Sequence, residues 1–164
     1  MTQAEPVTVT GSVAILGGHL GVVPAQPPDR IGDPDDIGLT LDGEKLPVVG
    51  QRVEVRGTLH ARVLDVSDWE PAPESAWAWS TVRPVKVAGI DEAIAHEVVD
   101  AVPEGYCRSI GESKAMNGRY VVELQVDRLT DEVVEWVAEQ PPGSVLLYPF
   151  ITPAALAGCV AIAH

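Results

Sequence analysis

The chain has 164 residues, of which 46% are apolar and 21% are charged, and its formal net charge is −13. This composition is typical of a globular protein and excludes a disordered one. No apolar run reaches the roughly 18 to 20 residues that cross a bilayer. The amino terminus also lacks the basic and apolar regions of a secretory signal. We therefore expect a cytoplasmic protein without a membrane partner, and the eight Arg against three Lys hint at a GC-rich bacterial source.

The acidic residues are spread evenly along the chain. The part that ends at Glu74 holds 12 acidic and 5 basic side chains, and the remainder holds 12 and 6. Such a charge distribution repels the phosphate backbone, whose attraction to Lys and Arg supplies most non-specific affinity for nucleic acid. Nucleic acid is therefore not expected as a partner. The acidity fits either solubility alone or a surface that meets a basic protein.

Alternating apolar residues predict several strands in the first half. Residues 7–15 alternate around Gly11, where a bulge would bend the strand. A short strand is predicted at 38–41. Residues 49–59 form the clearest strand, and residues 62–66 return as its hairpin partner.

These segments together resemble small bacterial OB-fold-like domains. The resemblance rests on the strand with Gly11, the long loop from Gly17 to Gly38, the segment Gly50-Gln-Arg-Val-Glu-Val-Arg-Gly57, and the exit Asp65-Val-Ser-Asp-Trp-Glu70. It implies an antiparallel β-barrel domain over residues 1–70, and it implies no particular function, because OB-folds bind many kinds of ligand. The Pro-rich residues 71–76 are the predicted linker.

The second half, residues 77–164, is predicted to alternate strands and helices. Strands are expected at 79–87, 106–110, 119–126 and 145–151, with helices at 92–102, after Asp91, and from Thr130 to the Pro-Pro-Gly at 141–143. This βαββαβ order resembles ferredoxin-like domains. The predicted fold class is thus α+β, an OB-like barrel followed by a ferredoxin-like domain. The alternative is a single α+β domain with one merged sheet.

No spacing of His or Cys is typical of a metal site, and no cofactor motif is present, so neither a metal nor a cofactor is expected. The Asp residues at 29, 33, 35 and 36 depart from the calcium-loop spacing and favour a solvated loop. Cys107, beside Arg108, is a candidate nucleophile, although a buried inert thiol is the favoured interpretation. No catalytic residue is assigned.

Three tryptophans that flank the predicted linker, Trp69, Trp77 and Trp79, are the candidate binding residues. Aromatic side chains near a barrel mouth can stack bases, but here the basic groove that should accompany them is missing. The favoured interpretation is that Trp77 and Trp79 pack the two domains together.

The sequence therefore favours a non-enzymatic binding protein, an accessory, inhibitor or immunity-like factor whose acidic surface engages another protein. Two alternatives stay open. One is a small enzyme that uses carboxylates or Cys107 between its domains. The other is an OB-type protein that binds single-stranded nucleic acid. The sequence does not indicate the identity of the partner or the oligomeric state.

Overall fold

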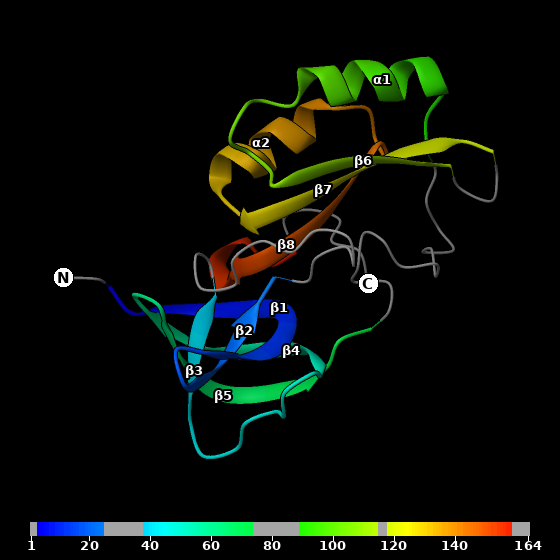
Figure 1. Cartoon of the computed structure of the whole chain (residues 1–164). Helices are drawn as coiled ribbons and strands as arrows, with labels where there is room; N and C mark the ends of the chain where they lie inside the picture. The colour runs from blue at the N-terminus through cyan, green and yellow to red at the C-terminus, as the bar shows by residue number, and fades with distance from the viewer. Residues whose placement is uncertain (1–2, 25–37, 74–88, 115–117, 159–164) are drawn as a thin grey trace. The chain divides into compact units, whose positions relative to one another are not determined.

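The computed structural model describes residues 3–24, 38–73, 89–114 and 118–158 (Figure 1). It is a mixed α+β fold with one sheet of eight strands and two α-helices among these residues. The strands are β1 (Glu5–Leu16), β2 (His19–Val23), β3 (Leu39–Asp42), β4 (Arg52–His60), β5 (Val63–Pro71), β6 (Ser109–Lys114), β7 (Tyr120–Arg128) and β8 (Val145–Pro153); the helices are α1 (Glu92–Ala101) and α2 (Asp131–Glu139), and a 3-10 turn, η3, covers Ala154–Leu156.

Internal contacts divide the chain into two compact units. The first consists of Met1–Ala72 with Phe150–Ala155, and the second of Pro73–Pro149 with Leu156–His164. The long strand β8 therefore contributes its first residues to the second unit and its last residues to the first.

The first five strands pair in a circuit. Strand β1 pairs antiparallel with both β2 and β4, β2 pairs antiparallel with β3, β3 pairs parallel with β5, and β5 pairs antiparallel with β4. Each of the five strands thus has two partners within the circuit. The predicted first strand, the short strand near residue 40 and the hairpin of the clearest segment are all present.

Alternation along β1 and β4 builds the core of the first unit. Val9 and Val55 face each other across the two strands and are fully buried. Gly11 is needed in β1 because a Cβ there would meet the backbone carbonyl oxygen of Val23 on β2. The valine side chains Val7, Val9 and Val13 of β1 thus point to one side and form a continuous cluster with apolar side chains of the other four strands and Phe150.

In the second unit, both helices cover one face of strands β6, β7 and β8 (Figure 1). The buried side chains Ala95 and Val98 of α1 and Val133 of α2 share a core with Val122 and Leu124 of β7. Val126 of β7 and Val145 and Leu147 of β8 also belong to this core. This core fixes which faces of the helices remain exposed.

The strand order in the sheet is β2-β3-β5-β4-β1-β8-β7-β6. Strand β8 lies directly beside β7 in the sheet. In a ferredoxin-like sheet, by contrast, another strand lies between the two strands that precede and follow the second helix. The end of β8 pairs antiparallel with β1, with Val9 opposite Ile151. Local sequence patterns did not predict this pairing.

Several predictions differ from the structure or lie outside it. The strand predicted at 106–110 begins at Ser109, because the amide of Tyr106 closes a turn onto the carbonyl of Pro103. The strand predicted at 79–87 and residues 74–76 of the predicted linker lie outside the described residues. Within the described ranges, no helix is both long enough and apolar enough to cross a membrane.

Candidate functional site

The two helices present a surface of carboxylates, which we call the acidic helical surface. Apart from His96, every ionisable side chain on the helices is acidic. All of these carboxylate residues are exposed: Glu92, Glu97 and Asp100 on α1, and Asp131, Glu132, Glu135 and Glu139 on α2. Because the helices cover the same face of the sheet, their charges add into one negative field.

Some of these carboxylates stand where they lower helix stability. Asp100 lies in the last turn of α1 and Glu139 ends α2, and neither last turn holds a basic residue. The C-terminal end of a helix carries a partial negative charge, so an acid there is repelled. Glu135 also lies four residues from both Asp131 and Glu139, the spacing at which like charges oppose each other on a helix.

The first turns of the helices differ in how they are capped. Thr130 accepts a hydrogen bond from the amide of Val133 at 3.4 Å, as expected for an N-cap residue. Asp91 occupies the N-cap of α1 but makes no capping hydrogen bond. Its carboxylate instead faces the guanidinium of Arg119 at 3.5 Å.

His96 joins α1 to strand β6. Its Nδ1 lies 2.7 Å from Oε1 of Glu112, and its Nε2 lies 4.0 Å from Oε1 of Glu92. The hydrogen bond and negative charge of Glu112 raise the pKa of His96 above its ordinary value, and Glu92 and Asp100 add to this effect. The His96 side chain is solvent-exposed and that of Glu112 is partly exposed, so solvent screens the contribution of the pair to stability.

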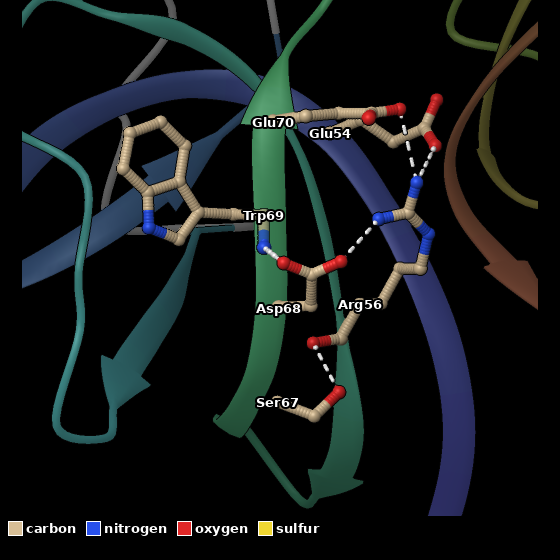
Figure 2. A network of polar contacts seen from close by, with 6 residues as sticks. All are labelled: Glu54, Arg56, Ser67, Asp68, Trp69 and Glu70. Carbon is tan, nitrogen blue, oxygen red and sulfur yellow. Dashed lines mark hydrogen bonds and ion pairs between the residues drawn. The ribbon is translucent and has the colours of Figure 1, made fainter.

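A second polar group lies on the first unit, around Arg56 (Figure 2). The guanidinium contacts Oδ2 of Asp68 at 3.0 Å, Oε1 of Glu70 at 2.9 Å and Oε1 of Glu54 at 3.3 Å. Asp68 and Glu70 stand opposite Arg56 and Glu54 across β4 and β5. One cation thus offsets three carboxylates here, in contrast to the acidic helical surface.

Trp69 lies beside this group but points away from it, as Figure 2 shows. Its indole is half-buried and packs against the core of the first unit, while its backbone amide donates to Oδ1 of Asp68 at 2.8 Å. The other two candidate binding residues, Trp77 and Trp79, lie outside the described residues. The three tryptophans are thus not placed together as one site.

Cys107 is half-buried against the core of the second unit. Burial raises the pKa of its thiol, which lowers the thiolate fraction and opposes nucleophilic chemistry. No group of His, Cys, Asp and Glu within the described ranges is arranged to hold a metal ion.

Sequence reasoning did not single out a buried carboxylate, Glu123 on β7. Its Oε1 accepts a hydrogen bond from the hydroxyl of Tyr148 at 3.0 Å, and its Oε2 accepts one from Ser113 at 2.8 Å. Burying a charge without such donors is costly, so these contacts hold the carboxylate within the sheet. Nothing in the local sequence indicates the contact with Tyr148, because it joins two separate strands.

Comparisons of this chain with protein-family models, curated proteins and solved structures give no match.

Proposed function

We propose that this chain is a non-enzymatic binding protein whose acidic helical surface engages a basic protein, as an accessory, inhibitor or immunity-like factor would. The observation that carries the proposal is the absence of Lys and Arg from both helices while their exposed carboxylates accumulate, even at helix ends where acids lower stability. A surface needed only for solubility would gain from placing cations at those ends.

The local charges support a protein partner over nucleic acid. Around Arg56 the guanidinium is already surrounded by carboxylates, so it is not presented to a phosphate. A titration of labelled single-stranded DNA at about 50 mM salt, where backbone attraction is strong, should show no anisotropy change. Saturable binding there would favour the nucleic-acid alternative.

The fold we propose for the first unit is an OB-like barrel, a common binding scaffold. Its support is the circuit of pairings through β1, β2, β3, β5 and β4, with β3 and β5 parallel. For the second unit, the adjacency of β7 and β8 counts against a ferredoxin-like order. The binding proposal depends on the two helices and not on that fold assignment.

Affinity capture tests the proposed function directly. With the full chain as bait in lysate of the native host at low salt, one basic partner should be retained in stoichiometric amount and released as salt rises. The variant E132Q/E135Q/E139Q should lose this partner. Retention of nothing specific, or unchanged retention by the variant, would contradict the proposal.

A matched variant distinguishes the effect of where the carboxylates lie from the effect of the net charge of the chain. The substitutions E54Q/D68N/E70Q around Arg56 change the net charge by the same amount on the other unit. They should leave capture unchanged. An equal loss with both variants would show that net charge alone governs retention. Circular dichroism of both variants verifies that each is folded.

A further inference from the structure

Strand β6 is the edge of the sheet in the second unit. Within the described part of the chain it hydrogen-bonds to β7 alone. Ile110, Gly111 and Glu112 in its middle are exposed, and a Cβ built at Gly111 would meet no atom within 4 Å. An edge of this kind presents a row of backbone N–H and C=O groups that can pair with another strand.

Of the features that protect natural sheet edges, this strand has one carboxylate on the face that α1 covers, Glu112, and a lysine only at its end. Its only lysine is Lys114, at its last position, and that ammonium lies 6.0 Å from the centre of the Tyr120 ring. No proline interrupts the strand. The side chain of Ile110 is 42% exposed, so an apolar group is available on a strand that pairs, among the described residues, with β7 alone.

Apart from His96, the ionisable side chains of helix α1, which lies beside this edge, are acidic. Ile110 and Glu112 lie on the face that α1 covers, since Glu112 contacts His96 of that helix and Ile110 pairs with the core residue Leu124. Helix α1 packs against β6, and its ionisable side chains other than His96 are all acidic. A strand laid along β6 would therefore meet one apolar side chain and a negative field on its α1 side.

We propose that β6 accepts an added β-strand from a partner protein, and that this strand is an extended segment with basic residues alternating with apolar ones. The proposal rests on the proposed function, because it takes the acidic helical surface as the source of charge selection. Main-chain hydrogen bonds supply the affinity in this mode of recognition, and alternate side chains supply the specificity.

Charge selects this occupant over a second copy of the chain. Each copy has a net charge of −13 and carries the same acidic helix beside the same edge. Pairing two β6 strands would bring these like charges together, whereas a basic strand would neutralise them.

The test uses a labelled peptide of alternating lysine and valine, eight residues long and capped at both ends. Fluorescence anisotropy measures its affinity for the full chain, and amide hydrogen exchange measures protection at those amides of residues 110–112 that point away from β7, since amides alternate in direction along a strand. The peptide should bind saturably and slow exchange at these amides. The same peptide N-methylated at two adjacent central residues, which blocks pairing along both of its edges, should bind about tenfold more weakly.

A pair of variants locates the binding. Ile110→Lys places a cation on the edge and should weaken the peptide about tenfold, because it adds repulsion and removes the apolar contact. Ile15→Lys is the matched control, because Ile15 is 56% exposed on the first unit and the change in charge is identical. It should leave the affinity within about twofold.

Each contrary result overturns a stated part of the proposal. Equal affinity of the plain and N-methylated peptides would exclude strand addition while leaving the acidic-surface function standing. Equal affinity of a glutamate–valine peptide would exclude charge selection. A dimer that Ile110→Lys dissociates in sedimentation would make a second copy the occupant. Absence of binding at about 1 mM peptide, a weak limit for a specific contact, would overturn the proposal outright. Failure of the proposed function is instead shown by unchanged capture with E132Q/E135Q/E139Q.

Discussion

Replacing Glu135 by lysine tests whether the acidic helical surface lowers the stability of α2. Glu135 is exposed and lies four residues from both Asp131 and Glu139. Each like-charge pair at this spacing destabilises a helix by roughly 0.2–0.5 kcal/mol, and an opposite-charge pair stabilises it by a similar amount. The substitution reverses both of these pairs and also the pair with Glu132, three residues away, so we expect the free energy of unfolding to rise by about 1 kcal/mol after solvent screening.

The gain in unfolding free energy is measured by urea unfolding at low salt, with far-UV circular dichroism as the signal. The Tm should also rise by about 2–4 °C. Glu132→Lys is the matched control, with the same change in charge on the same helix. Glu132 lies in the first turn, where the helix dipole favours an acid by about 0.3–1 kcal/mol; losing this interaction offsets the reversal of its pair with Glu135, so no gain is expected. Equal stabilisation by both substitutions would refute the reasoning, since overall charge and not position would then set the effect.

Three further predictions follow from other contacts. Glu112→Gln should lower the pKa of His96 toward its ordinary value, as read from imidazole shifts in an NMR titration. Because folding raises this pKa, the stabilisation by the His96–Glu112 pair is fully present below about pH 6.5 and is lost as pH rises through the raised pKa. A stabilisation by this pair that grows with pH would contradict this. Leu64→Ala should lower the unfolding free energy by about 2–5 kcal/mol, because Leu64 is fully buried, while Val63→Ala should change it by less than about 0.5 kcal/mol. Cys107 should react with iodoacetamide more slowly in the folded chain than in urea, because burial raises its pKa; equal rates would show that the thiol is accessible.

Strands and helices with strong local patterns were predictable from the sequence. The alternation along β1 and β4, and the cap at Thr130, are set by neighbouring residues, and the structure confirms them. The pairing of β8 with β1 was not predictable in the same way. It joins Val9 to Ile151, near opposite ends of the chain, and no local rule fixes such a register.

The same distinction between local patterns and long-range pairing applies to the candidate sites. The carboxylates of α1 and α2 follow from the helix positions alone, because helical spacing determines which side chains share the exposed face. The contacts of Arg56 with Asp68 and Glu70 depend on the register of β4 against β5, which shifts between Arg56 and Gly57. Alternation predicts a hairpin there but does not place the irregularity that decides which carboxylates face the guanidinium.

Replacing Glu135 by lysine is expected to raise the stability of the chain and, if the binding proposal is right, to weaken its binding to the partner. Comparing the two effects shows whether the acids of α2 serve binding or solubility alone. If the acids of α2 serve solubility alone, Glu135→Lys should give a more stable chain that captures the same partner to the same extent. If they bind a basic protein, the more stable variant should retain less of it, because residues kept for binding often lower stability. Measuring unfolding free energy and partner retention on the same preparation distinguishes the two. Undiminished retention by the stabilised variant would remove Glu135 from the proposed binding surface.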